Sequence, residues 1–314
     1  PSEHGIHESL EIYHKGLGEL ARIARLRMHK LNYGILGEFR RQGYHTEIIT
    51  ANPFVTPAFG FRASTKLATP TGISQVPIES GDIYIFPEAL RQRQLRILVK
   101  KLYYHIRQIL DPKQKGGINI VRYIEKNRPP SPYFLLINLM EAHDPYSIVD
   151  LFRDTIFNGN EERRLKTIID GRCPPEAYRS VKPYPEHANY AISLVLKLAR
   201  LLDDRNTLII VTSDHGQGLC DPEYLHQYWL SDNLLRVPLW VKYPNTPIPQ
   251  KGRYVPLTQI PQILRTAFGE KTPHIGSDKA YAESFGTYVG NKKLHNMVEK
   301  WLDKIFVERR KVYQ

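Results

Sequence analysis

Asp214 and His215 are the side chains whose types and position most directly suggest chemistry. They follow the apolar run 208–211, which is typical of a strand buried on both faces, and Gly216 and Gly218 after them allow a tight backbone turn. Ligands of parallel sheets bind just beyond the carboxyl ends of the strands. A carboxylate beside an imidazole suits a divalent cation, or a phosphate-like or sulfate-like group held by one. The alternative is that the pair only shapes a surface turn, where polar residues are common.

A second predicted strand ends in a similar way. The apolar run 133–140 is followed closely by His143, Asp144 and Pro145. Pro145 biases Asp144 toward an extended conformation and prevents a helix from continuing through it. We therefore expect His143 at the tip of its strand, at the same sheet edge as the Asp-His pair. A single histidine at a strand end is more often a structural residue, but two such ends in one chain favour a site.

A third candidate is His226, which lies between the Asp-His turn and the apolar segment 237–243. Its neighbours include Tyr224, Tyr228 and Trp229. Taken alone, this histidine is best interpreted as a partly buried structural imidazole. Only the other motifs make it a candidate for a functional site.

Taken in order, these motifs resemble those of the sulfatase family, a branch of the alkaline-phosphatase superfamily. The resemblance rests on MEAHDPY at 140–146, TSDHGQGL at 212–219, and a histidine before WLSDNLLRVPLWVKYP at 229–244. The flanks agree: LGEFRRQGYHTEIIT resembles the family's helix, Gly-Tyr turn and strand, VPLTQIPQILRTAFG its segment near the end of the sheet, and AYAESFG a late strand. The resemblance extends from Pro1 to about Gly286.

This resemblance implies a fold and a set of residue roles. The fold class would be α/β, a mostly parallel sheet sandwiched between helices, with a small carboxy-terminal appendage. Asp214 and His215 match the pair that coordinates the active-site metal. His143 matches the histidine that contacts the substrate's anionic or leaving group, and His226 matches a basic residue that faces the substrate oxygens. The resemblance thus implies catalytic roles for His143 and His226. The expected cofactor is a divalent metal, Ca²⁺ first, with Zn²⁺ or Mn²⁺ as alternatives because one ligand is an imidazole.

Two motifs of the family find no match in this sequence. Relatives carry an acidic pair on the first strand and a Cys, Ser or Thr nucleophile, whereas this sequence has no Asp before Asp82, and its cysteines are Cys173 and Cys220. The segment PSEHGIHES at 1–9 resembles the stretch just past the nucleophile. We therefore expect an amino-terminally truncated chain with half a metal site, whose own activity stays open.

The expected function of the intact enzyme is metal-dependent hydrolysis of sulfate esters. Its substrate would be an anionic small molecule, a glycan or a lipid-headgroup ester. One alternative is a phosphoryl-group hydrolase or phosphotransferase of the same superfamily, which is favoured by His215 at a position where many sulfatases carry Asn. Another is a catalytically dead protein that retains the fold and binds anions.

Length and composition fit one large α/β domain, since 314 residues with 41% hydrophobic side chains can bury a sizeable core. We expect this domain over 1–270, with a Pro-rich insertion at about 152–185, and an appendage of a strand and a helix over 271–314. No run of about 18 apolar residues is present, so no transmembrane segment is expected. Two cysteines do not make a disulfide framework, which favours a reducing compartment and a cytoplasmic location.

The formal net charge of +12 comes from 44 basic and 32 acidic residues. Basic residues are densest over 91–115, where leucine and isoleucine recur at helical spacing, so we expect an amphipathic helix with a solvated basic face. No nucleic-acid-binding signature accompanies this cluster, and attraction of anionic substrates accounts for the charge equally well. A nucleic-acid partner is therefore disfavoured.

Strand and helix patterns alternate along the chain. The expected strands are 45–50, 81–86, 133–140 and 208–211, and the expected helices are 31–42, one beginning at 116–125, 190–202, and one from 291 onward. Such alternation predicts a mostly parallel sheet that is covered on both faces.

Overall fold

The computed structural model describes residues 34–57, 61, 63–76, 110–147, 173, 175–220, 224–225, 230–244, 246–272 and 274–282. The chain divides into two compact units. Unit 1 contains residues 1–148 and 184–201, and unit 2 contains residues 149–183 and 202–314. Each unit is described by itself.

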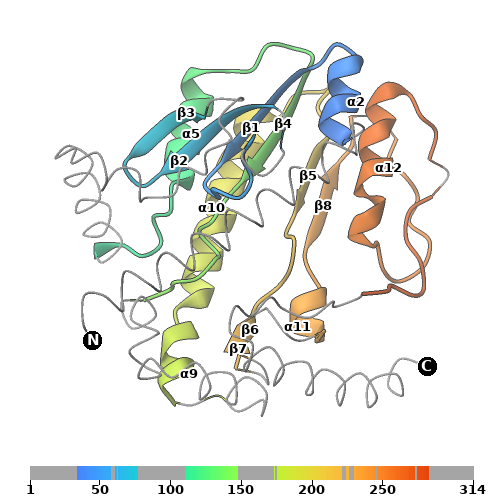
Figure 1. Cartoon of the computed structure of the whole chain (residues 1–314). Coiled ribbons are helices and arrows are strands. Elements are labelled where there is room, and N and C mark those ends of the chain that lie inside the picture. Colours follow the sequence, from blue (N-terminus) through green and yellow to red (C-terminus); the bar gives the residue numbers. More distant parts are fainter. Residues whose placement is uncertain are drawn as a thin grey trace, which may run out of the picture. The chain divides into compact units, whose positions relative to one another are not determined.

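Unit 1 is built on a four-stranded sheet with the order β3-β2-β1-β4 (Figure 1). Its strands are β1 (His45–Thr50), β2 (Ser64–Thr69), β3 (Gly72–Val76) and β4 (Tyr133–Asn138). The inner strand β1 pairs in parallel with both β2 and β4, and β3 adds an antiparallel edge to β2. Parallel pairing places the carboxyl ends of β1 and β4 at the same edge of the sheet, with Thr50 opposite Asn138.

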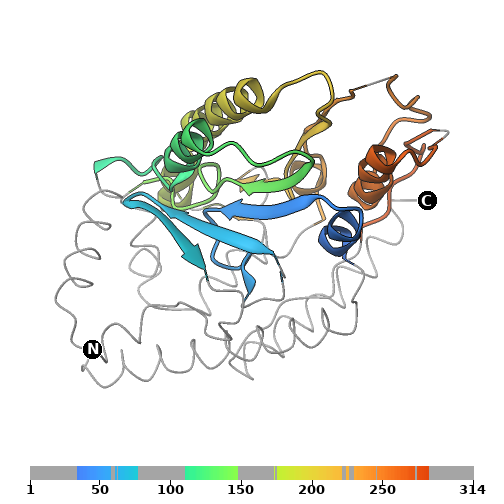
Figure 2. The ribbon, with the colours of Figure 1, turned by 90° about the horizontal axis from the view of Figure 1, so that it is seen from above.

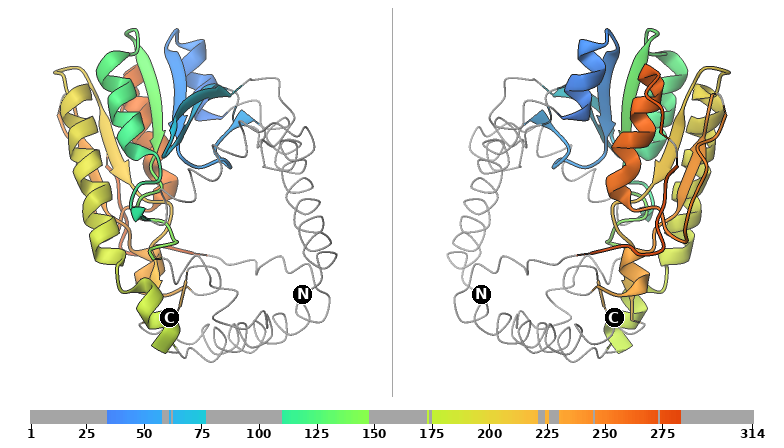
Figure 3. Two further views of the ribbon diagram at one scale, coloured as in Figure 1. Left: turned by 90° about the vertical axis from the view of Figure 1, so that its left-hand side faces the viewer. Right: turned by 90° about the vertical axis from the view of Figure 1, so that its right-hand side faces the viewer.

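Strand β1 is buried on both of its faces. Ile48 and Ile49 are successive residues, so their side chains point to opposite faces, and both have no exposed surface. The apolar side chains that a parallel sheet requires on both faces are therefore present. Figures 2 and 3 show α5 (Gly117–Lys126) and α10 (Tyr184–Leu202) on one side of this sheet and α2 (Ile35–Arg41) on the other.

The covering helices bury one stripe each. In α5 the buried residues Ile120, Val121 and Ile124 recur at helical spacing, and the helix packs on β2 and β3. In α10 the buried residues include His187, Leu194 and Leu198. Among these the histidine is the only polar side chain, and it lies near the beginning of the helix.

Unit 2 contains two small antiparallel ladders and short helices. Strand β5 (Ile209–Thr212) pairs with β8 (Leu239–Lys242), and β6 (Gly218–Leu219) pairs with β7 (Tyr224–Leu225). Its helices are α9 (Pro175–Val181), α11 (Asp232–Leu235) and α12 (Ile260–Arg265), with 3-10 turns η2 (Leu257–Gln259) and η3 (Thr266–Phe268) on either side of α12. No helix among the described residues is both long and apolar enough to cross a bilayer.

The α/β fold class predicted from the sequence is confirmed. Strands β1, β4 and β5 and helices α2, α5 and α10 lie where the sequence predicted them. The prediction that β5 is buried on both faces, as in a parallel sheet, is wrong: β5 pairs antiparallel with β8, and none of its residues is fully buried. In addition, α10 begins at Tyr184, six residues before the predicted residue 190, and α9 occupies part of the predicted insertion at 152–185. The end of that segment is therefore helical, and Pro175 at the first position of α9 suits a helix start because its missing N–H would have no partner there.

Strands β2 and β3 were not predicted from the sequence. Strand β2, STKLAT, has only Leu67 and Ala68 as apolar residues, and they are adjacent, so no alternating pattern marks it. The predicted strand 81–86, most of the predicted basic helix at 91–115, and the predicted helix from 291 lie outside the described residues. The domain boundary expected at residue 270 stays a prediction.

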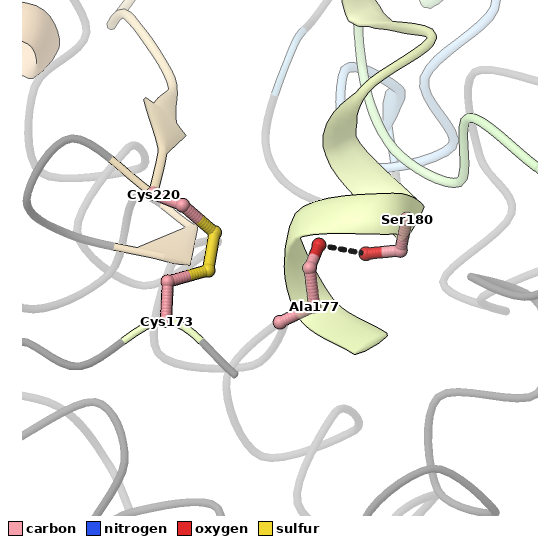
Figure 4. Close-up of a disulfide and its surroundings, with 4 residues drawn as sticks. All are labelled: Cys173, Ala177, Ser180 and Cys220. Atoms are coloured by element: carbon pink, nitrogen blue, oxygen red, sulfur yellow. Dashed lines mark hydrogen bonds between the residues drawn. A yellow bond between two sulfur atoms is a disulfide. The ribbon is translucent and has the colours of Figure 1, made fainter. Parts of the chain in front are cut away.

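Cys173 and Cys220 form a disulfide in unit 2, with their Cα atoms 5.3 Å apart (Figure 4). Such a separation is ordinary for a disulfide. The bond joins the segment before α9 to the residue that directly follows β6, and Ser180 Oγ in α9 donates a hydrogen bond to the Ala177 carbonyl at 2.8 Å. The pairing removes the basis for inferring a reducing compartment from the cysteine count.

We expect the disulfide to stabilise unit 2. Replacing both cysteines, Cys173→Ser with Cys220→Ser, should lower the free energy of unfolding by about 2–4 kcal/mol because the unfolded chain gains freedom. Mass spectrometry after alkylation under denaturing conditions checks the pairing directly, and Ser180→Ala serves as a control that leaves both thiols intact. Alkylation of both cysteines without a reductant would contradict the structure.

Candidate functional site

The four predicted site residues fall into three groups. His143 belongs to unit 1, Asp214 and His215 belong to unit 2, and His226 lies outside the described residues. The convergence of all four at one rim therefore stays a prediction. Each half of the site can be built from its own contacts.

His143 lies in the turn 141–146, which follows β4 at the carboxyl edge of the sheet. The His143 amide donates to the Met140 carbonyl at 3.0 Å, and the hydroxyl of Tyr146, a fully buried residue, donates to the Ala142 carbonyl at 3.1 Å. Two hydrogen bonds between nearby residues thus stabilise the turn. The sequence prediction that His143 lies at the tip of its strand is correct within a few residues, because β4 ends at Asn138.

Polar residues surround the carboxyl ends of β1 and β4. The Thr50 hydroxyl lies 3.4 Å from Asn138 Oδ1 and accepts a hydrogen bond from the Asn52 amide at 2.8 Å. Asn52 in turn accepts from the Phe54 amide through Oδ1 at 2.9 Å. These residues form a hydrogen-bonded polar edge close to the start of the His143 turn.

Asp144 sets the charge of His143. The ring nitrogen Nδ1 of His143 lies 2.8 Å from Asp144 Oδ1 and 2.7 Å from the Asp144 carbonyl oxygen. Burial of the ring lowers the pKa of His143, but the hydrogen bond and the negative charge of Asp144 raise it by more, so the pKa lies above its ordinary value. The imidazole side chain remains 40% exposed. His143 is therefore protonated more readily than an ordinary histidine, and a small anion can reach its ring.

Glu141 connects the turn to the first residues of α5. It is completely buried, and its Oε1 accepts the amide of Gly117 at 2.7 Å and the amide of Lys115 at 3.2 Å. The residue before the helix is Gly116, which offers no side chain to cap these amides, so a carboxylate from the turn takes that role. Burial raises the pKa of Glu141, while these amides and the Lys115 charge oppose the rise.

Gly117 makes this capping geometry possible. A Cβ atom at Gly117 would lie 2.6 Å from Glu141 Oε2 and 2.7 Å from Leu194 Cδ1. Only a glycine lets the carboxylate approach the helix backbone so closely. The first turn of α5 and the His143 turn are therefore fitted to each other.

Lys115 and His187 also contact the turn. Lys115 is buried, and its ammonium group contacts the His143 carbonyl, lies 3.5 Å from the Glu141 carbonyl oxygen and stands 5.3 Å from the centre of the Tyr146 ring. His187 is also buried; its Nδ1 lies 3.2 Å from the Glu141 carbonyl oxygen and its Nε2 lies 3.0 Å from the Tyr146 carbonyl oxygen. Burial, with the Lys115 charge second, lowers the pKa of His187.

These contacts correct one expectation and show what sequence analysis missed. Lys115 was assigned to a solvated basic face, yet it is 7% exposed, because the His143 turn folds over it. Glu141 had a visible signal, as it lies two residues before His143 in MEAHDPY. His187 had none, since it lies between the predicted insertion and the predicted helix.

Asp214 and His215 lie in the loop that leaves β5. Ser213 Oγ donates to the His215 carbonyl at 2.7 Å, and Asp214 Oδ1 accepts the His215 amide at 3.0 Å. The next residue, Gly216, donates its amide to the Leu234 carbonyl at 2.8 Å, and a Cβ atom there would lie 1.9 Å from the Asn233 carbonyl oxygen. Glycine is thus required where the loop passes α11.

The orientation of His215 suits a metal ligand. Its Nδ1 lies 2.7 Å from the Gly216 carbonyl oxygen, so Nδ1 carries the hydrogen and Nε2 carries the lone pair. Nε2 lies 3.8 Å from Asp214 Oδ2. Two ligand atoms that each lie about 2.0–2.2 Å from one tetrahedral cation are about 3.4 Å apart, so a small movement of these accessible side chains lets the pair hold one ion. Both side chains are accessible, at 80% exposure for Asp214 and 39% for His215.

Asp214 and His215 offer two ligand atoms to a metal ion. The described residues contain no group of three or more His, Cys, Asp or Glu that could hold a metal ion. A zinc site typically uses about four ligands, and calcium about six to eight. Asp214 and His215 therefore fit a metal as part of a larger set of ligands.

The Sulfatase family model matches residues 34–270, which is more than half of the chain. The chain belongs to the sulfatase family. The matched region includes His143, Asp214, His215 and His226, and the family is one of typically metal-dependent hydrolases. A comparison with curated proteins found no match.

We expect Asp144→Asn to lower the pKa of His143, because the amide lacks the carboxylate's charge. The pKa can be measured by NMR titration of the His143 ring, and Glu125→Gln, which removes an exposed carboxylate from α5, is the matched control. An unchanged His143 pKa in Asp144→Asn would show that the ion pair does not set the charge.

The ion pair between His143 and Asp144 should make the free energy of unfolding depend on pH. The pKa of His143 is higher in the folded state than in the unfolded state, where it is about 6.5. The contribution of the ion pair to the free energy of unfolding is therefore fully present below the unfolded-state pKa and is lost as the pH rises through the folded-state pKa. The difference in free energy of unfolding between the wild type and Asp144→Asn should therefore be larger near pH 6 than at about pH 9.

Proposed function

We propose that this sulfatase-family chain binds and acts on sulfate esters through His143, His226, Asp214 and His215. The observation that carries the proposal is the arrangement of His143, a reachable imidazole whose pKa Asp144 keeps above the ordinary value. Membership of the family supports sulfate as the group recognised. The substrate is an anionic small molecule, a glycan or a lipid-headgroup ester, and the net charge of +12 favours its approach.

His143 has two chemical roles in this proposal. As an imidazolium it stabilises the negative charge on the sulfate oxygens. As a general acid it gives its proton to the alkoxide that leaves when a nucleophile attacks the sulfur, and that nucleophile has no matching motif in this sequence. Asp144 holds the ring through Nδ1, which directs Nε2 toward the substrate. A pKa somewhat above the ordinary value keeps the acid form populated near neutral pH.

Asp214 and His215 hold the metal in this proposal. When bound, a divalent cation neutralises charge on the sulfate oxygens. The Asp214 carboxylate suits Ca²⁺, which is the first candidate, whereas the His215 imidazole suits Zn²⁺ or Mn²⁺. Gly216 and α11 keep the two ligand side chains in their loop. His226 is proposed as a second basic group that faces the anion.

A phosphoryl-group hydrolase or phosphotransferase is the second candidate. The observation that favours it is the oriented Nε2 of His215, because an imidazole ligand is more common for zinc and manganese than for calcium. An anion-binding protein without turnover is the third. These candidates differ in what they transform, and one set of assays separates them.

The test combines metal binding with turnover. Calorimetric titration with Ca²⁺, Zn²⁺ and Mn²⁺ should show at least about tenfold weaker binding for Asp214→Asn and His215→Ala. Asp232→Asn is the matched control, because this exposed aspartate of the same unit is paired with Arg236 at 2.7 Å. Release of the phenol from aryl sulfate or aryl phosphate then identifies the reaction.

The outcomes are distinct. Turnover of aryl sulfate that falls in His143→Gln supports the proposal, and turnover of aryl phosphate alone supports the second candidate. Sulfate binding without turnover supports the third. Metal binding that is unchanged in the Asp214→Asn and His215→Ala double variant would overturn the assigned ligands.

A further inference from the structure

Two buried basic residues converge on the backbone of the turn 141–146. Lys115 comes from the segment just before α5, and His187 comes from the first turn of α10. Their side-chain nitrogen atoms contact main-chain oxygen atoms of the turn: the carbonyls of Glu141 and His143 for Lys115, and those of Glu141 and Tyr146 for His187. Residues far apart in the sequence thus hold the beginning, the middle and the end of one short turn.

We propose that Lys115 and His187 are positioning residues for His143, which hold the carbonyl groups of its turn and thereby fix the direction of its imidazole. The proposal rests on the function proposed for His143. Neither residue needs to contact the substrate.

The burial of Lys115 needs an explanation that solvation alone does not offer. An ammonium group taken out of water loses several kcal/mol of hydration unless polar partners replace the water. The nearby Lys113 has a solvated alternative: its side chain is 39% exposed and lies 3.8 Å from Glu186. Lys115 instead lies under the turn, against two carbonyl oxygens and the face of Tyr146. Its hydration is replaced by the turn, so the turn must keep its shape for Lys115 to stay buried.

His187 holds the two ends of the turn at once. A neutral imidazole has one N–H, so it donates to only one of the two carbonyl groups at a time, whereas an imidazolium can donate to both. The charges that act on the ring are those of Lys115 and Lys113, and the ring of Tyr146 packs edge-on at 5.2 Å. Burial, followed by the lysine charges, keeps the pKa of His187 low, so the neutral ring with one donated hydrogen bond is the form at neutral pH.

Fixing these carbonyl groups has a consequence for His143. The contact of 2.8 Å between His143 Nδ1 and Asp144 Oδ1 joins neighbouring residues inside the turn. If the backbone of the turn moves, the ring and the carboxylate no longer keep this geometry. The direction of Nε2, and the contact with Asp144 that raises the pKa of His143, therefore depend on the backbone that Lys115 and His187 hold. The charge of Lys115 itself lowers the pKa of His143, so Lys115 acts on the ring through the backbone of the turn and not by raising that pKa directly.

Amide hydrogen exchange and histidine NMR on the full chain test the proposal. Lys115→Met and His187→Phe should each accelerate exchange of the His143 amide at least about tenfold, because the turn loses buried hydrogen bonds. His187→Phe should also lower the pKa of His143 toward its ordinary value. His187→Gln keeps a donor for one carbonyl and should recover most of both properties.

Matched controls separate positioning from general destabilisation. Lys126→Met removes an exposed charge from the last turn of α5, and Leu198→Ala opens a cavity under α10 away from the turn. Both should leave the exchange of the His143 amide, relative to amides of β1, as in the wild type. If His187→Phe does not fold, His187→Gln together with Lys115→Met decides the question.

Unchanged exchange of the His143 amide in the folded variants, an unchanged His143 pKa in His187→Phe, or an equal change in Leu198→Ala would overturn the proposal. The pKa is not compared in Lys115→Met, because loss of the Lys115 charge shifts it directly. Binding of inorganic sulfate, measured on the same samples, tests the proposed function separately. A wild type that binds no sulfate with metal present overturns that function, while the NMR readout still decides whether Lys115 and His187 position His143.

Discussion

The capping of α5 by Glu141 is the interaction on which the His143 half of the site depends. A helix start with glycine at its cap needs an acceptor from elsewhere, and the buried carboxylate of the turn after β4 supplies it. Because this acceptor lies two residues before His143, the backbone of α5 and the position of the imidazole are set together. Gly117 is the condition for this arrangement, since any side chain there would collide with the carboxylate.

Differences in burial and in neighbouring charges give the two histidines around the turn 141–146 different pKa values. His143 remains partly exposed, and Asp144 raises its pKa, while burial and the charge of Lys115 lower the pKa of His187. The two histidines differ in role because their surroundings shift their pKa values in opposite directions. In unit 2 the same residue type has a third role: the His215 ring is fixed by the Gly216 carbonyl and directs a lone pair toward the side of Asp214.

The strands that carry the site could be predicted from the sequence, because β4 and β5 are apolar runs that end at Asp, His, Pro and Gly. Strand β2 could not be predicted, because its sequence STKLAT shows no alternation of apolar and polar residues. Its place in the sheet comes from its pairing with β1. The candidate residues His143, Asp214 and His215 came from local motifs. Lys115 and His187 could not be found in this way, because their role depends on contacts across 28 and 41–46 positions of sequence.

We propose that His143 and the Asp214–His215 pair bind the same tetrahedral anion. Anomalous X-ray diffraction from crystals of the full chain grown with Mn²⁺ and tungstate tests this proposal. We expect one tungstate within hydrogen-bonding distance of the His143 ring, next to one Mn²⁺ ion bound by Asp214 and His215. Tungstate bound away from His143, or Mn²⁺ bound by other residues, would contradict it.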